Sequence, residues 1–488
     1  MQFTISKKTN DFIEEVYHRV GTENKAVLGR AGLFLALNEK IPEHFPRPES
    51  DGVTMRDETI LSDEFSVLVR AILNHHVGKT LDEKEYSRYF KLYFEYGCHR
   101  LRQIWEDTGK DQVQFISDLL TLGSANLVDQ PKITPNVISI NIGKEKSTEK
   151  DVIFNINRIT EHLNPHFAIM GTSGSGKTTF LKHLLREIRK VSDYKTNFVI
   201  FDYKNGDIAQ DEEFIVDTQA EVIDPKKSPL PLNVFAEDAL HEQNQKECAE
   251  KIVNLVKSVE ATIGKVQEQK LYEAILNAYK NHSPYPDFYA VRSELEKLND
   301  KPDSLTSVFR PLTEQNYFAK TGQKIYSSWT DKTLIVDIHD IEKKDLVCFF
   351  VLNQIHHELK KLGESPAKND IRHIRTIIVI DEAHYFLKNP RRAKILENIV
   401  REVRSSGGAV ILSSQSPDDY DNTKFDFLEM MEFPIVLKSN PESGKFIEQK
   451  FSVSPQRAKE ILKALGHLNV GEAYILVDKL PTVVGLNK

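Results

Sequence analysis

Residues 167–180 read FAIMGTSGSGKTTF, an apolar run that stops at a glycine and leads, five residues later, into glycine, lysine and two threonines. Residues 171–178 meet every fixed position of the pattern G-x-x-x-x-G-K-[ST]. Glycines in such a loop let successive backbone N–H groups turn inward around a polyphosphate. The stretch therefore predicts a phosphate site between a strand and a helix.

The sequence on either side of this loop fits a strand and a helix. Residues 167–170 form a short buried-strand pattern, and residues 178–190 carry apolar side chains on one helical face, so that the helix N-terminus favours an anion. We expect Lys177 to reach the β and γ oxygens of ATP and the Thr178 hydroxyl to ligate Mg²⁺. The residues expected to contact the nucleotide are Gly171, Thr172, Ser173, Gly174, Ser175, Gly176, Lys177, Thr178 and Thr179.

Composition describes an ordinary soluble protein with an ample core. Hydrophobic residues make up 40% and charged residues 28% of the 488 residues, and no apolar run approaches the length of a membrane span. The first residues lack the apolar core of a signal peptide, and the three cysteines have no metal-ligand spacing. We expect a cytoplasmic protein without a membrane partner. The net charge of −7 gives no sign of a general affinity for nucleic acid.

The chain divides into a helical part and a mixed part. Residues 1–125 carry apolar residues at helical spacing, and residues 126–136 have the composition of a linker. From 137 to 488, Ile/Val-rich strand patterns alternate with helical ones, which is typical of a mainly parallel sheet covered on both faces. Residues 236–330 interrupt this alternation with helical patterns, and we expect a helical insertion there.

The strand over residues 375–382 ends in two carboxylates, which hydrolysis of a triphosphate would require. Asp381 is the expected Mg²⁺ ligand, and Glu382 the residue that polarises the attacking water. Gln415 ends the next strand and is expected to sense the γ-phosphate. Asp202 ends a further strand, where it is equally well explained as a turn residue or as part of the nucleotide site.

Cations follow these acids along the chain. A helix that runs to Gly407-Gly408 presents Arg401 and Arg404 in its last turn, where they either complement the helix dipole or reach a neighbouring subunit's nucleotide. The segment KNPRRAK, directly after the acid pair, is either a loop that grips DNA phosphates or a solvated helix start. Its cations, the candidate DNA contacts, are Lys388, Arg391, Arg392 and Lys394.

Taken together, IMGTSGSGKTTFLKHLL, VIFDYKNGD, IIVIDEAH and REVRSSGGAVILSSQSP resemble the HerA/FtsK superfamily of hexameric DNA-translocating P-loop ATPases over roughly residues 134–488. The resemblance implies a RecA-like P-loop NTPase fold with a mainly parallel sheet, and a homo-hexamer that acts on DNA. It also favours Arg404 over Arg401 as a residue acting in trans, because the family's arginine precedes the sensor glutamine by the spacing between Arg404 and Gln415.

The N-terminal part resembles a second family, DndE, a small helical protein associated with DNA phosphorothioate modification. The stretches FTISKKTNDFIEEVYHRVG, ENKAVLGRAGLFLALNEK, ESDGVTMRDETILSDEF and YSRYFKLYFEYGCHRLRQI carry this resemblance, in that order. The family is thought to bind DNA, but residues 1–130 here hold 16 Lys+Arg against 21 Asp+Glu, a balance of −5. Direct binding to DNA and a role as an adaptor or oligomerisation platform both stay open.

Two functions follow from these resemblances. The first is a Mg²⁺-dependent ATPase that translocates or unwinds duplex DNA without regard to sequence, in a phosphorothioation or anti-phage defence system. The second is an ATP-binding scaffold that recruits a nuclease or DNA-modification enzyme as its partner and does not translocate. Glu382 favours the first, because a pure switch could dispense with it.

Overall fold

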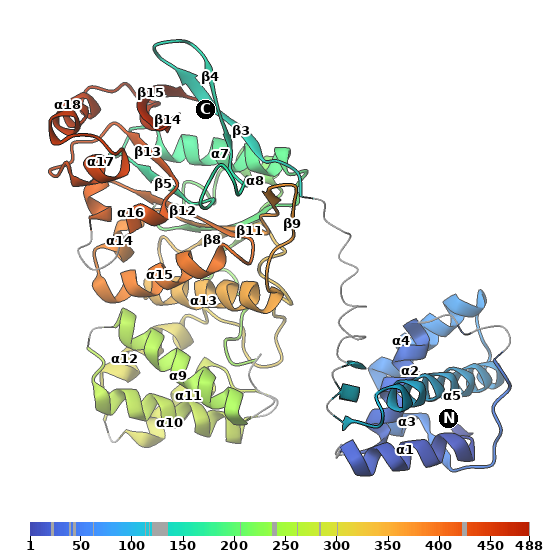
Figure 1. The fold of residues 1–488 in the computed structure, drawn as a ribbon. Helices are drawn as coiled ribbons and strands as arrows, with labels where there is room; N and C mark the ends of the chain where they lie inside the picture. The colour runs from blue at the N-terminus through green and yellow to red at the C-terminus, as the bar shows by residue number, and fades with distance from the viewer. Residues whose placement is uncertain are drawn as a thin grey trace. The chain divides into compact units, whose positions relative to one another are not determined.

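The computed structural model describes two compact units, Met1–Lys132 and Ile133–Lys488, which Figure 1 draws. The residues described are 1–20, 24–38, 41, 45–61, 63–112, 114–116, 118–119, 135–204, 206–236, 242–260, 262–282, 285–299, 301–421 and 427–487. Most of the linker predicted at 126–136 lies outside them. No helix in these ranges is both long and apolar enough to cross a membrane.

The first unit is mostly helical. Its helices are α1 (Lys7–Val20), α2 (Lys25–Asn38), α3 (Asp57–Ile60), α4 (Asp63–Val77) and α5 (Glu83–Asp107). Helices α2 and α5 cross with their backbones in contact at two glycines: a Cβ added to Gly97 would lie 1.8 Å from the carbonyl oxygen of Gly32. Sequence patterns missed the short antiparallel pair β1 (Gln2–Thr4) and β2 (Thr54–Arg56) beside these helices.

The second unit is built on one large sheet. Its strands are β3 (Ser139–Glu145), β4 (Asp151–Asn155), β5 (Phe167–Met170), β6 (Asn197–Asp202), β7 (Glu221–Ile223), β8 (Leu334–Asp337), β11 (Thr376–Ile380), β12 (Gly408–Ser414), β13 (Phe433–Leu437), β14 (Glu472–Val477) and β15 (Leu480–Leu486). They lie in the order β4-β3-β15-β14-β13-β5-β12-β11-β6-β8-β7, parallel from β13 to β7 and antiparallel from β13 to β4. The small pair β9 (Ala367–Lys368) and β10 (Ile371–Arg372) stands apart. The mainly parallel α/β fold is confirmed.

Helices cover both faces of this sheet. Alternate residues of β5 point to opposite faces, with Phe167 and Ile169 in the core that contains α7 and α8, and Ala168 and Met170 in the core that contains α13 and α15. The covering helices are α7 (Lys177–Val191), α8 (Glu212–Thr218), α13 (Lys344–Leu362), α14 (His384–Leu387), α15 (Pro390–Val403), α16 (Phe427–Met430), α17 (Lys445–Lys450) and α18 (Pro455–Leu465). Burial on both faces explains why the strands are apolar throughout.

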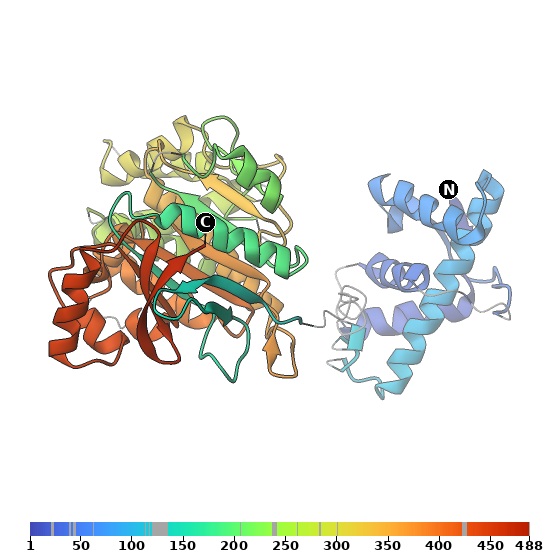
Figure 2. The ribbon, with the colours of Figure 1, turned by 90° about the horizontal axis from the view of Figure 1, so that it is seen from above.

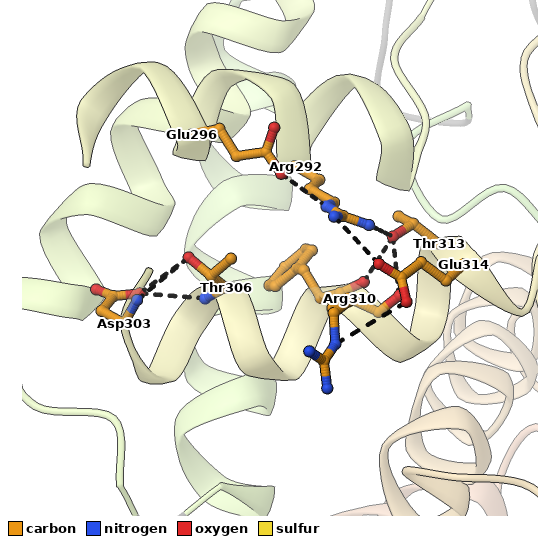
Figure 3. Close-up of polar contacts among 8 residues, drawn as sticks. Arg292, Glu296, Asp303, Thr306, Arg310, Thr313 and Glu314 are labelled. Atoms are coloured by element: carbon orange, nitrogen blue, oxygen red, sulfur yellow. Dashed lines mark hydrogen bonds and ion pairs between the residues drawn. The ribbon is translucent and has the colours of Figure 1, made fainter. Parts of the chain in front are cut away.

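The chain between β7 and β8 forms a further helical layer. It contains α9 (Glu242–Val259), α10 (Lys265–Asn281), α11 (Phe288–Leu298) and α12 (Ser304–Glu314), which lie beyond α13 and α15 from the sheet (Figure 1). Arg292 of α11 ties this layer together, because its guanidinium donates to Glu296 and to the Thr313 hydroxyl of α12, both at 2.8 Å (Figure 3). The N-terminus of α12 is capped by Asp303, which accepts from the backbone N–H of Thr306.

Parallel strands place their following loops at one edge of the sheet. Met170 at the end of β5 pairs with Ser414 of β12, and Ile380 at the end of β11 pairs with Leu412 of β12 and Phe201 of β6. The strands can be followed from above in Figure 2. The glycine loop, the acid pair, Gln415 and the loop after β6 therefore share one edge.

A buried histidine fixes three of these elements to one another. His166, which directly precedes β5, is 2% exposed; its Nδ1 accepts from the backbone N–H of Val410, and its Nε2 donates to the carbonyl of Val400. Since one ring nitrogen must accept, the imidazole is neutral. Burial, together with the nearby Arg404, lowers the pKa of His166 to about 3.

We expect His166 to destabilise the fold in acid. In the unfolded chain His166 takes up a proton near pH 6.5, whereas in the folded chain it does so only near pH 3. The free energy of unfolding therefore falls by about 1.4 kcal/mol per pH unit as the pH drops between these values. His373, whose pKa burial and Arg375 lower to about 4, acts in the same direction. Urea unfolding between pH 7.5 and 4.5 measures this: the free energy of unfolding should fall less steeply with pH in His166→Asn than in the normal chain. Equal slopes in the two proteins would contradict the prediction.

Candidate active site

The glycine loop runs from Gly171 to Gly176 between β5 and α7, and the geometry of the loop explains why its glycines are needed. Gly174 and Gly176 have φ angles of +79° and +100°, which other residues rarely adopt. At Gly171 a Cβ would lie 2.6 Å from the Ser175 hydroxyl and 2.9 Å from Leu437 Cβ. The backbone of this loop can therefore take its shape only with glycine at these positions.

The loop lines a cavity of about 310 Å³ at the edge of the sheet. Lys177 is 7% exposed and its Nζ donates to the carbonyl of Gly171 at 2.6 Å; burial lowers its pKa, while Glu382 and Asp381 oppose that shift. The Ser175 hydroxyl is buried and lacks a hydrogen-bond partner within the described residues. A buried ammonium beside a turn of backbone N–H groups fits a bound polyphosphate. Thr172, Ser173, Gly174, Gly176, Thr178 and Thr179 also line the cavity.

The acid pair lies on the same cavity. Asp381 is 6% exposed, and burial raises its pKa, whereas a cation beside it would favour the ionised carboxylate. Thr178 faces the same space from the first turn of α7. One carboxylate and one hydroxyl beside a phosphate cradle are suitable oxygen ligands for Mg²⁺, which keeps several waters in such sites.

Glu382 is held in a strained position by three neighbours. Its φ angle is +61°, in the left-handed region that only a few per cent of non-glycine residues adopt. Its Oε2 accepts from Gln415 Nε2 at 2.9 Å and lies 3.1 Å from His384 Nδ1, while Lys204 Nζ lies 3.6 Å from Oε1. Burial alone would raise the pKa of Glu382, but the hydrogen bonds from His384 and Gln415 outweigh it and lower the pKa to about 2. The carboxylate is therefore ionised at neutral pH, with Gln415 and His384 beside Oε2 and Lys204 beside Oε1.

The loop after β6 adds a cation that sequence patterns did not single out. Lys204 lines the cavity from the loop after β6, two residues beyond Asp202, and its side chain is 41% exposed. Asp202 Oδ2 accepts from the backbone N–H groups of Ile208 and Ala209, which gives it a turn role, although it also lines the cavity. The sequence already placed Asp202 at the end of a strand near this site. The lysine two positions later could therefore have been identified as a residue of the same site.

Removing the Lys204 charge should slow hydrolysis. Lys204→Ala takes away a positive charge beside Glu382 and the phosphate cradle, and we expect the turnover rate to fall by about 10²-fold. Lys182→Ala is the matched control, since Lys182 on α7 pairs with Asp211 at 2.7 Å and does not line the cavity. Steady-state phosphate release at saturating ATP measures both; equal rates would remove Lys204 from the site.

The two arginines at the end of α15 differ in their surroundings. Arg401 pairs with Glu397 of the same helix at 2.9 Å. Arg404 is exposed, and no side chain in the described ranges pairs with it. It precedes β12, whose seven residues span about 20 Å to the edge that carries the glycine loop. Arg404 therefore cannot reach the cavity of its own chain.

The four candidate DNA-contacting cations do not form one open patch. Lys388 pairs with Asp419 at 2.8 Å, Lys394 with Glu397 at 3.0 Å, and Arg392 with Asp345. Arg391 donates to the carbonyl of Lys257 at 3.5 Å. These partners hold the cations against their own unit, so their contact with DNA stays a prediction.

Two family models match parts of this chain. Residues 140–355 match the family described as helicase HerA, central domain, and residues 2–106 match the family described as DNA sulphur modification protein DndE. The first match contains the glycine loop and Lys204 and ends before Asp381, Glu382, Arg404 and Gln415.

Two curated relatives are 22% identical to this chain. The DNA import protein CedB of Sulfolobus acidocaldarius aligns over 367 residues, 75% of this chain and 58% of that protein. A probable helicase of Methanocaldococcus jannaschii aligns over 348 residues, 66% of this chain and 65% of that protein. The chain thus spans 58–65% of the length of these relatives. The solved structure of VirB4 of Thermoanaerobacter pseudethanolicus matches this chain with a TM-score of 0.55 at 16% sequence identity. The match covers 72% of this chain and 96% of the VirB4 chain, so the two share the fold.

Proposed function

We propose that this chain, in which a DndE domain (residues 2–106) precedes a HerA-type central domain (residues 140–355), is a Mg²⁺-dependent ATPase that moves or remodels duplex DNA. The observation that carries the proposal is the single cavity onto which the glycine loop, Asp381 and Glu382 open. Through its DndE domain the motor belongs to a DNA phosphorothioation or defence system, with a nuclease or modification enzyme as partner.

The roles of the site residues follow from their geometry. The backbone N–H groups of residues 171–176 and the Lys177 ammonium bind the phosphates of ATP, and Thr178 and Asp381 would hold Mg²⁺. When bound, Mg²⁺ neutralises charge on the phosphate oxygens. Glu382 orients the attacking water through Oε1, and Gln415, which bonds to Glu382 Oε2, relays the state of the γ-phosphate.

The distance of Arg404 from its own cavity supports a ring of identical subunits. A cation with no partner among the residues described, at the opposite edge of the sheet, is suited to neutralise charge on the nucleotide of a neighbour. We propose a homo-hexamer, the assembly implied by the resemblance to HerA and FtsK proteins. Duplex DNA would then be gripped through its phosphates, without regard to sequence.

A second function, an ATP-controlled scaffold, is favoured by one observation. Glu382 is held by Gln415, His384 and Lys204, so the carboxylate that would activate water is already bonded within the chain. In a scaffold this arrangement would persist with ATP bound and keep turnover slow. In a motor, contact with DNA would free the Glu382 carboxylate from these partners.

DNA dependence of hydrolysis separates the two functions. We expect the rate of phosphate release to rise at least fivefold on addition of blunt duplex DNA, and mass photometry with ATP and Mg²⁺ to detect six-subunit particles. A slow rate that duplex DNA leaves unchanged would support the scaffold. A chain that stays monomeric under all these conditions, yet hydrolyses ATP at the full rate, would exclude the ring.

A further inference from the structure

The helical unit contains a cavity of about 750 Å³ that has no part in the proposed motor. It lies between the start of α1, residues 45–49 and the C-terminal half of α5. Its volume falls within the range of pockets that hold small organic ligands.

Four cations line this cavity: Lys8, Arg47, Arg100 and Arg102. Lys8 and Arg47 are exposed and have no hydrogen-bond or ion-pair partner among the described residues. The buried carboxylate of Glu95, also in the lining, is turned into the fold, where it accepts from the Ser6 hydroxyl at 2.8 Å and the Thr9 hydroxyl at 2.6 Å. Glu49, which is exposed, is the other acid of the lining, so the lining carries four cations and two carboxylates, a balance of +2.

Three of these cations act on the His99 imidazole, which also lines the cavity. Arg102 Nη2 is 3.1 Å from His99 Nδ1, and burial, followed by the charges of Arg102, Lys8 and Arg100, lowers the pKa of His99. Neutral His99 accepts from Arg102 through Nδ1, which leaves its Nε2–H as a donor. Arg102, Lys8 and Arg100 thus lie around one imidazole in the lining of the cavity.

One wall of the cavity is aromatic, and it is anchored. The ring of Phe45 packs edge-on against Tyr96 at 5.1 Å and lies 5.8 Å from His99. The segment that carries Phe45 is tied to α5 by Lys91, whose ammonium donates to the carbonyl of Glu49 at 2.7 Å and to the Ser50 hydroxyl. Phe45 is thereby held in the lining of the same cavity as the cations.

We propose that this cavity binds a free nucleotide, with its phosphates on the four cations and its base against Phe45 and Tyr96. Arginine and lysine bind phosphate oxygens, and aromatic faces stack on bases of any sequence. Free nucleotide is favoured over DNA, because the cavity is too small for a duplex and residues 1–130 carry a net charge of −5, which repels a polyanion. The helical unit would then report nucleotide levels to the motor.

The test uses the full chain carrying Lys177→Ala, which weakens the glycine-loop site, with N-methylanthraniloyl-ADP in EDTA as the probe. Adding Lys8→Glu and Arg47→Glu should weaken saturable binding at least tenfold. Lys84→Glu with Arg88→Glu is the matched control: it changes the net charge by the same −4, and both residues lie on α5 at least seven residues, about 10 Å of helix, before Glu95, the first α5 residue in the lining. This control should change binding less than twofold.

Hydrogen exchange in the chain with an intact glycine loop gives an independent readout. ADP should protect amides in residues 45–52 of that chain and lose this protection in the Lys8→Glu/Arg47→Glu variant. No saturable binding, or equal binding in the two charge-reversed variants, would overturn the proposal. If inorganic phosphate competes as strongly as ADP, the cavity is a simple anion site. If a 5′-phosphorylated duplex competes more strongly than ADP, the cavity binds DNA. Either result would also overturn the proposal.

Discussion

Replacing Glu382 with glutamine is expected to lower ATP hydrolysis by about 10²–10⁴-fold while ATP still binds. The amide keeps the size of the side chain and can keep the hydrogen bond from Gln415 and the contact with His384, but it cannot accept a proton or orient water as a carboxylate does. Binding should be unchanged or tighter, because one negative charge beside the phosphates is removed. Single-turnover hydrolysis and filter binding of labelled ATP measure the two effects.

The pH dependence of this variant is a second check. Since hydrogen bonds from His384 and Gln415 hold the pKa of Glu382 at about 2 against its burial, the carboxylate stays ionised above pH 5. The ratio of normal to Glu382→Gln rates should therefore be constant from pH 5.5 to 8.5. Glu364→Gln, at an exposed acid that pairs with Arg372, serves as control and should leave the rate unchanged. Near-normal hydrolysis by Glu382→Gln would mean that another group activates water.

The sheet and the glycine loop could be predicted because their signals are local. Strands buried on both faces are apolar throughout, and a glycine loop before a lysine needs only a few neighbouring residues to be identified. The strand β13 was missed for a local reason as well. It contains Pro434, and proline within a central strand argues against a strand.

What could not be predicted depends on contacts between distant parts of the chain. The pairing of β1 with β2 joins three-residue segments about 50 positions apart, too short for a pattern to be visible. The cations of KNPRRAK looked free in the sequence, but Arg392 meets Asp345 and Lys388 meets Asp419 only in the folded unit. The same holds for Glu382, two of whose partners, Gln415 and Lys204, come from the loops after β12 and β6.

Replacing Arg404 with alanine is expected to reduce hydrolysis by about 10³-fold or more while ATP binding stays normal. Arg404 lies about 20 Å from its own cavity along β12, so its removal leaves every contact between the chain and its own nucleotide in place. What is lost is a positive charge that a neighbouring subunit's nucleotide needs as phosphate charge develops. Arg401→Ala, one turn earlier, removes only the pair with Glu397 and should stay within twofold of normal.

Mixing subunits tests whether Arg404 acts in trans. Lys177→Ala alone should be inactive, because its own phosphate site is damaged, although its Arg404 is intact. In a mixed ring, a subunit with Arg404→Ala contributes a sound cavity and its Lys177→Ala neighbour contributes the arginine, so about a quarter of the interfaces in a 1:1 mixture should be active by random assembly. Two inactive preparations that regain hydrolysis on mixing can do so only through a shared site. A mixture that stays inactive, or an Arg404→Ala chain with full activity, would place the needed cation elsewhere, and Lys204 would then be the next residue to examine.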